Sequence, residues 1–493
     1  MTRAFGNAAW PLVAVVMVAA TCLASGAGVD RDRLVASMLG PTPLAQDLET
    51  LSDRIGGRPT GSEANRRAVA WTESRLKDAG VDVRRERFAV NGPWLERSAR
   101  AAVAGEGVSF NPRVAAMPYS IGTGPGGFTA PIRSAGRGTV ADFGALGASA
   151  RGAILLVNQD ELQDIDGLFR EYNETAAIEQ RARAAGVAGV AYMGSRASGL
   201  LYRHNVAIGP KNTLPMVVME RDAARRIDRL LRDGAALTLT LDIDIDTTPA
   251  EADNVIAELK GSSRPEEIVL MGAHLDSWDL GAGTLDNGAN SVLMVDLARQ
   301  IARLGVKPAR TIRLVLWNGE ELGMQGSFAY VRAHQAELDR HVVAGAVDVG
   351  CGRINGFYTG GRPDLVTAVG RALEPLAGLG PFTQADVPLV GTDNFDFMLE
   401  GVPNLVANQE PARYGPSYHA ANDQLSQCDV STLRSNGAVL AGLLWDFADD
   451  STARLPRQTR AEIDALMGRT DLADQMKTFN LWDEWARGTR GRH

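Results

Sequence analysis

The sequence is poor in cysteine, has no surplus of basic residues and has no long apolar run beyond its first residues. Only 3 of 493 residues are cysteine, and 59 acidic residues against 51 basic ones give a formal net charge of −8. A chain of this charge has no basic field for nucleic acid, so we expect no DNA or RNA partner. After residue 28 no segment reaches the roughly 20 apolar residues that cross a bilayer, so we expect no membrane span in the mature chain.

The first 28 residues are typical of an export signal. Arg3 precedes an apolar run at residues 8–20, and small residues at 24–27 suit cleavage. Pro11 interrupts the run, which is short for a spanning helix. We therefore predict a cleaved signal peptide at 1–28 and a secreted or periplasmic protein. Cys22 offers lipoprotein anchoring as an alternative, although the residues before it fit a lipidation site poorly.

Two cysteines, Cys351 and Cys428, remain after this cleavage. An even number of cysteines in an oxidising compartment is compatible with a disulfide. Two free, buried thiols fit the sequence equally well, so the pairing stays open at this point.

The length of the chain and its changes in pattern predict two domains with a terminal extension. Between 119 and 246, Gly-rich turns separate short strands, and the stretch 237–245 alternates strictly between apolar and polar residues. We predict an inserted, mostly β domain there. Strands and helices alternate after the insert, which indicates a mixed, mostly parallel α/β sheet with helices on both faces. The predicted parts are catalytic segments at 29–118 and 247–456 and a charged C-terminal extension at 457–493.

Imidazole and carboxylate side chains follow three successive predicted strands, at 268–273, 311–317 and 341–347. The carboxyl ends of neighbouring strands in such sheets meet at one edge, where ligands bind. We therefore expect these side chains, with others from two loops, to converge on a single crevice. The candidate site residues are His274, Asp276, Asp286, Glu320, Glu321, Asp348, Tyr418 and His419.

Each candidate also has an ordinary structural interpretation. Asp286 could cap the helix that follows it, and Glu320 with Glu321 could complement a helix dipole. Together, however, five carboxylates in one crevice would repel one another, by about 4 kcal/mol for a pair 4 Å apart at an effective dielectric of 20. Two Zn²⁺ ions would reverse that balance. We therefore predict a site for two zinc ions.

The motifs resemble those of the co-catalytic zinc exopeptidases, the family that includes bacterial leucyl aminopeptidases. The similar segments are HLDSWD at 274–279, LDNG at 285–288 and WNGEELG at 317–323, followed by Asp348 and His419. The resemblance covers about residues 34–456. It implies the zinc exopeptidase fold with an inserted protease-associated domain. Within the family, the chain most resembles one carboxypeptidase. The similar segments are HLDSWD, RLVLW at 313–317 with EE at 320–321, GTD at 391–393 and GVP at 401–403.

The resemblance also implies a role for each candidate. His274 and Asp348 would bind one zinc, Glu321 and His419 the other, and Asp286 would bridge both. Asp276 would orient His274, and Glu320 would be the general base for a water held between the metals. The position of Tyr418 beside His419, and not the resemblance, makes it a candidate to stabilise the oxyanion, although a packed aromatic ring is the more common role for such a residue. The remaining histidines, His204, His334, His341 and His493, are expected to be solvated.

The expected function is hydrolysis of dipeptides or short peptides next to a free terminus. The motifs do not decide between aminopeptidase and carboxypeptidase specificity, and Asn394 departs from the His of many relatives near the substrate pocket. Two alternatives stay open: a glutaminyl-cyclase-like acyltransferase with one zinc, and a catalytically silent binding scaffold. A homodimer is expected from the family.

Overall fold

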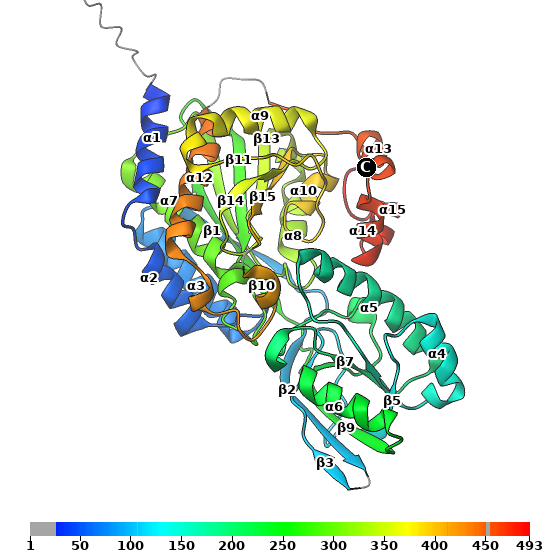
Figure 1. Cartoon of the computed structure of the whole chain (residues 1–493). Coiled ribbons are helices and arrows are strands. Elements are labelled where there is room, and N and C mark those ends of the chain that lie inside the picture. The colour runs from blue at the N-terminus through cyan, green and yellow to red at the C-terminus, as the bar shows by residue number, and fades with distance from the viewer. Residues whose placement is uncertain (1–25, 106, 412, 450–453) are drawn as a thin grey trace, which may run out of the picture.

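The computed structural model describes residues 26–105, 107–411, 413–449 and 454–493 (Figure 1). The predicted signal peptide lies outside these residues except for 26–28, which begin helix α1 (Gly26–Leu39). Cys22 is likewise outside them. Within the described part of the chain, no helix is long and apolar enough to cross a membrane.

The seven-stranded sheet carries the candidate site. Its strand order is β1-β10-β12-β11-β13-β15-β14; the four strands β12, β11, β13 and β15 are mutually parallel, and the outer pairings are antiparallel. The predicted mixed α/β sheet is therefore confirmed, but it is not mostly parallel: three of its six strand pairings are parallel, at its centre, and three are antiparallel. The strands are β1 (Asp82–Ala89), β10 (Glu251–Leu259), β11 (Arg264–His274), β12 (Arg310–Trp317), β13 (His341–Ala346), β14 (Ile354–Tyr358) and β15 (Asn404–Gln409).

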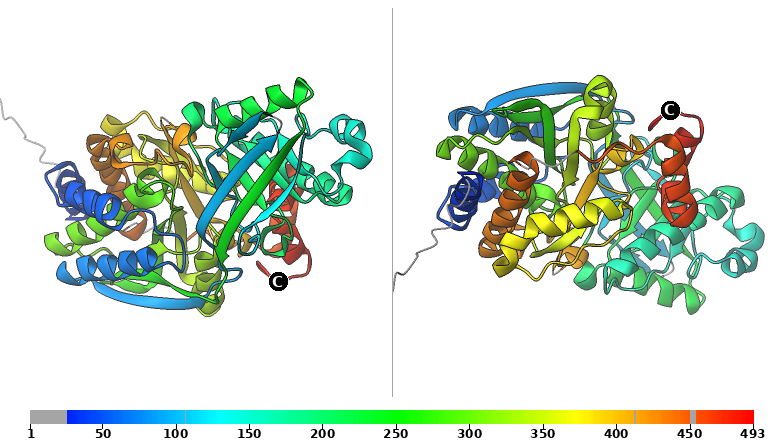
Figure 2. Two further views of the ribbon diagram at one scale, coloured as in Figure 1. Left: turned by 90° about the horizontal axis from the view of Figure 1, so that it is seen from below. Right: turned by 90° about the horizontal axis from the view of Figure 1, so that it is seen from above.

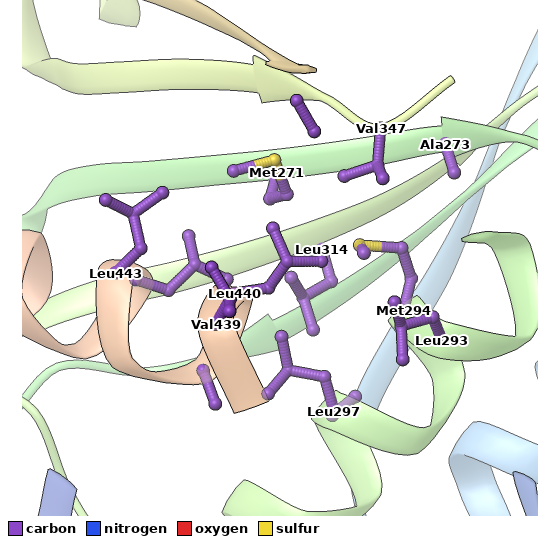
Figure 3. Packing of buried hydrophobic residues seen from close by; sticks show 14 of the residues in the cluster. Met271, Ala273, Leu293, Met294, Leu297, Leu314, Val347, Val439, Leu440 and Leu443 are labelled. Atoms are coloured by element: carbon purple, nitrogen blue, oxygen red, sulfur yellow. The ribbon is translucent and has the colours of Figure 1, made fainter. Parts of the chain in front are cut away.

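Helices cover both faces of this sheet, because alternate residues of its central strands are apolar on both sides. Met271 and Ala273 of β11 pack with Leu293 and Leu440 on one face (Figure 3), whereas Leu270 packs with the opposite face. Each buried aliphatic side chain of this kind contributes about 1.5–3 kcal/mol. The first face carries α1, α2 (Leu44–Glu49), α3 (Glu63–Asp78), α7 (Ala289–Leu304), α9 (Pro363–Leu373) and α12 (Val430–Asp449), and the second carries α8 (Gln325–Ala333) and α10 (Phe395–Leu399).

A second sheet, with strand order β3-β2-β9-β5-β6-β7-β8-β4, forms the insert. It begins before the predicted boundary at 119, because β2 pairs antiparallel with β9 from Leu95 to Gly105 (Figure 2, left). Three helices pack on it, so the insert is α/β and not mostly β. Its elements are β2 (Leu95–Gly105), β3 (Val108–Phe110), β4 (Val114–Ala116), β5 (Phe128–Ser134), α4 (Val140–Leu146), β6 (Ile154–Val157), α5 (Ile165–Ala185), β7 (Gly189–Met193), β8 (Met216–Met219), α6 (Arg221–Arg232) and β9 (Leu237–Asp246).

The C-terminal extension is folded and packs on the catalytic domain. It contains α13 (Arg460–Arg469), α14 (Leu472–Thr478) and α15 (Trp482–Ala486). Met476 and Trp485 are buried in one apolar cluster with Phe395 and Leu399 of the catalytic domain. The extension is therefore part of the globular body (Figure 1).

Cys351 and Cys428 form a disulfide, with 5.5 Å between their Cα atoms and 77 residues between them in sequence. The bond joins the loop after β13 to the residues before α12. The alternative of two free thiols is therefore excluded.

Candidate active site

The parallel strands bring the predicted residues to one edge of the sheet. His274 is the last residue of β11 and pairs in register with Trp317, the last residue of β12. Glu320 and Glu321 follow β12, and Asp348 follows β13. The remaining two come from loops: Asp286 lies in the turn Thr284–Gly288 before α7, and His419 follows α11 (Tyr414–Ser417).

Five of these side chains form two adjoining clusters that share Asp286. In the first cluster, His274 Nε2 lies 2.9 Å from Asp348 Oδ1 and 3.1 Å from Asp286 Oδ1. In the second, His419 Nε2 lies 3.0 Å from Glu321 Oε2 and 3.4 Å from Asp286 Oδ2. Within each cluster, one ligand atom from each residue lies within 4.8 Å of the others. The membership matches the two ligand sets that the resemblance implied.

The donor atoms of both clusters fit zinc. All five residues are buried, and Asp286 Oδ2 and Glu321 Oε1 are buried oxygens without a hydrogen-bond partner. Burying an unpartnered carboxylate oxygen is costly unless a cation or donor meets it. Imidazole nitrogen and carboxylate oxygen are ligands that Zn²⁺ accepts in catalytic sites. Each cluster can therefore hold one such ion.

The ionisation of the protein groups reflects this crowding. Burial raises the pKa of Glu321, and burial together with the nearby Asp348 raises the pKa of Glu320 well above its usual value. Burial alone would lower the pKa of His274, but Asp348 and its other acidic neighbours raise it well above the ordinary value. The protein groups by themselves thus retain protons in the clusters. A divalent cation supplies the same compensating charge.

Asp276 lies beside His274, as expected, but contacts it mainly through the main chain. The Nδ1–H of His274 donates to the Asp276 carbonyl oxygen at 3.0 Å, while the Asp276 carboxylate lies 3.6 Å from Nδ1. That carboxylate accepts the Thr60 hydroxyl at 2.6 Å and the Glu321 N–H at 3.4 Å. Asp276 therefore links the imidazole of the first cluster to the backbone of a second-cluster residue.

Tyr418 packs on the second cluster. Its ring stacks on the His419 imidazole with 3.7 Å between centroids. Its hydroxyl lies 3.4 Å from the Tyr172 hydroxyl of the insert. The contacts thus favour the packing interpretation of Tyr418 over the oxyanion role, although the residue also lines the pocket described below.

Three further residues support the clusters and were not predicted. The Asp423 carboxylate accepts the N–H groups of Leu285 at 2.6 Å and Asp286 at 3.1 Å, which fixes the backbone of the shared residue. Arg58 donates to the carbonyls that precede the same turn, at Ala282 and Gly283. The third is Arg203 of the insert, whose carbonyl meets His419. Of these three, only the sequence position of Asp423, four residues after His419, indicated a link to the site.

Two of the histidines expected to be solvated are buried. The His204 ring lies at a tilt against the Tyr172 ring, with 4.3 Å between their centroids, and His341 Nε2 lies 3.0 Å from the Tyr330 hydroxyl. Burial lowers the pKa of each to about 4, so both are neutral near pH 7. The prediction failed because neither position carries a local pattern that distinguishes a buried imidazole from an exposed one.

A pocket of about 430 Å³ opens onto Glu320, Glu321, Tyr418 and His419. Its other walls come from the catalytic domain, the insert and the C-terminal extension. A larger hollow of about 800 Å³ lies near Thr60, but no member of either cluster lines it. The smaller pocket is therefore the one placed to receive a substrate.

Two clusters of nitrogen and oxygen donors at the carboxyl edge of a mixed α/β sheet, beside a free carboxylate and a pocket, define a metallohydrolase site. Residues 254–444, which contain His274 through His419, match the family described as peptidase family M28. In this segment the chain is similar to that family, and the comparisons support a zinc metallo-exopeptidase.

Known relatives agree with this assignment. The carboxypeptidase to which the motifs pointed is carboxypeptidase Q; the Mus musculus protein is 29% identical over 419 residues, covering 82% of this chain and 85% of its own length. The structure of a peptidase M28 precursor from Shewanella amazonensis SB2B is similar, with a TM-score of 0.78 at 27% identity, over 87% of this chain and 98% of that one. A zinc aminopeptidase from Bacillus subtilis shares the fold, with a TM-score of 0.66 at 22% identity over 84% and 96%.

Proposed function

We propose that this chain hydrolyses dipeptides or short peptides at a site that holds two zinc ions. The observation that carries the proposal is the position of Asp286, whose two carboxylate oxygens each face a different imidazole. A carboxylate so placed can bridge two cations. His274 and Asp348 would be the other protein ligands of one ion. Glu321 and His419 would be those of the second ion.

Bound zinc supplies a Lewis acid for the scissile carbonyl and lowers the pKa of an attacking water toward about 7. Glu320 belongs to neither cluster, lines the pocket and lies 4.0 Å from His274 Nε2. Its carboxylate is therefore placed to take a proton from the attacking water and to return it to the leaving amine. Asp276 and Asp423 hold the surrounding groups in position during this exchange.

We further propose that the protein acts outside the cytoplasm, with residues 1–28 removed as a signal. The disulfide between Cys351 and Cys428 supports an oxidising compartment. We propose that the insert is a protease-associated domain, because its residues line the pocket beside the clusters. We also propose a homodimer, an expectation that rests on the family likeness alone.

The proposal is tested with dipeptides and tripeptides that are free, acetylated at the amino end or amidated at the carboxyl end. We expect hydrolysis of the free dipeptides. This activity should stop after treatment with a chelator and return when Zn²⁺ is added. The terminus whose blocking abolishes cleavage identifies the specificity. If no peptide is cleaved with zinc added, a binding scaffold is the better account; if only amino-terminal glutamine is cyclised, the acyltransferase is.

A further inference from the structure

The C-terminal extension lines the same pocket that opens onto the second cluster. A single pocket contains Glu320 and Glu321 at one part of its surface and a run of the extension at another. The residues of the extension that line it are Thr478, Phe479, Asn480, Leu481, Glu484 and Arg490. The peptidase site is therefore built from three parts of the chain: the catalytic domain, the insert and the extension.

The extension meets the insert across this pocket. The hydroxyl of Thr478, at the end of α14, donates to Asn173 Oδ1 of α5 at 2.8 Å. Next to this bond, the rings of Phe479 and Tyr172 lie 5.8 Å apart. Figure 1 and the right-hand view of Figure 2 show the C-terminal helices beside α5. These paired contacts form a bridge between two segments about three hundred residues apart in sequence.

Buried interactions hold the C-terminal extension, which forms one side of this bridge, on the catalytic domain. The Arg490 guanidinium binds the Asp396 carboxylate through two bonds of 2.7 and 2.8 Å, with both side chains almost fully buried. Gln475 Oε1 accepts the Val390 N–H at 3.3 Å, and Met476 is completely buried. Paired, desolvated charges and buried apolar side chains hold this segment in one place.

Tyr172 also connects the bridge to the second cluster. Its hydroxyl lies 3.4 Å from that of Tyr418, whose ring stacks on His419. The path from the clustered ligands to the bridge is therefore spanned by two aromatic side chains. Tyr172 and Phe479 both line the pocket that opens onto the clusters.

We propose that the segment from Gln475 to Glu484, docked on α5, is a wall that limits the length of the peptides this enzyme hydrolyses. The inference rests on the proposed peptidase function and goes beyond it. The pocket volume of about 430 Å³ falls near the lower end of the roughly 300–1,000 Å³ range of small-ligand sites. Each further residue of an extended peptide adds about 3.3 Å. Longer peptides must displace the bridge, so they lose kcat/KM relative to dipeptides.

The test compares kcat/KM for a ladder of peptides from two to five alanines. The variants are Phe479→Ala and Thr478→Ala on the extension and Asn173→Ala on the exposed face of α5, which removes the same bond from the other side. Lys477→Ala is the control, because its ammonium pairs with Asp474 and not with the insert. The wild-type and control proteins should discriminate steeply against the longer peptides. The ratio of the pentapeptide to the dipeptide value should rise by about tenfold or more in the bridge variants.

The outcomes separate this inference from the function on which it rests. A wild-type enzyme that cleaves dipeptides and pentapeptides equally well overturns the length limit but leaves the peptidase intact. An unchanged ratio of pentapeptide to dipeptide kcat/KM in Asn173→Ala also overturns the length limit and leaves the peptidase intact. The exposed side chain of Asn173 can be removed without disturbing a core. Failure of the wild-type protein with zinc to cleave any peptide in the ladder overturns the proposed function and the inference together.

Discussion

The carbonyl oxygen of Arg203 accepts the Nδ1–H of His419 at 3.2 Å, and the Arg203 N–H donates to the His419 carbonyl at 2.9 Å. The insert thus orients an imidazole of the catalytic domain. The Arg203 side chain is buried and binds both oxygens of Asp279 at 2.9 Å and Glu96 at 2.6 Å. Asp279 ends the HLDSWD motif that begins with His274, so one arginine links the insert to both clusters.

Replacing Arg203 should weaken zinc binding even though its backbone carbonyl remains. Arg203→Ala removes the bonds that hold the carbonyl against His419, and loss of a residue that orients a ligand typically costs about 10–100-fold in metal affinity. Chelator competition on folded protein measures this change. Arg113→Ala, which breaks an ion pair with Glu220 inside the insert, should leave zinc affinity unaltered. Equal zinc affinity in the two variants would show that Arg203 does not position His419.

Glu320→Gln should keep zinc but lose turnover. The amide has nearly the shape of the carboxylate but cannot accept a proton, and a positioned general base contributes about 10²- to 10⁴-fold. Steady-state kinetics on a dipeptide, with zinc content measured in parallel, tests this expectation. The exposed Glu374→Gln is the control. Turnover near the wild-type rate in Glu320→Gln would remove this residue from the mechanism.

Substitutions of Asp286 and Asp348 should differ in their effect on zinc content. Asp286 belongs to both clusters, whereas Asp348 belongs only to the cluster of His274. Asp286→Ala should therefore deplete both ions, and Asp348→Ala chiefly one. Zinc per chain, measured after dialysis, distinguishes these patterns. Two ions retained by Asp286→Ala would be incompatible with a shared ligand.

Glu179 of α5 should make stability depend on pH. Its side chain is buried, one oxygen accepts the Ala207 N–H at 2.9 Å and the other has no partner. Burial raises its pKa from 4.5 to about 7. The folded state therefore keeps this proton to higher pH than the unfolded state does, so the contribution to stability is complete below about pH 4.5 and is lost as pH rises through 7.

Glu179→Gln lacks this titration and should gain stability relative to the wild type as pH rises from 4 to 8, by about 3 kcal/mol. Denaturant unfolding of both proteins across this range measures the difference. A gap between the two proteins that stays constant with pH contradicts the assignment.

The sequence predicted the strands that carry the clusters because their apolar runs end in polar ligands. His274, Glu321 and Asp348 each follow such a run, so their convergence could be inferred from the geometry of parallel sheets. The start of the insert could not be inferred, because the pairing of Leu95 with Asp246 joins residues far apart in sequence. Arg203 was missed for the same reason: its partners Glu96, Ala116, Asp279 and His419 come from four separate segments.

Zinc content combined with anomalous scattering at the zinc edge tests the central claim most directly. We expect two ions per chain, one among His274, Asp286 and Asp348 and the other among Asp286, Glu321 and His419, with an Asp286 oxygen facing each. A single firmly bound ion, or two ions of which neither contacts Asp286, would contradict the account.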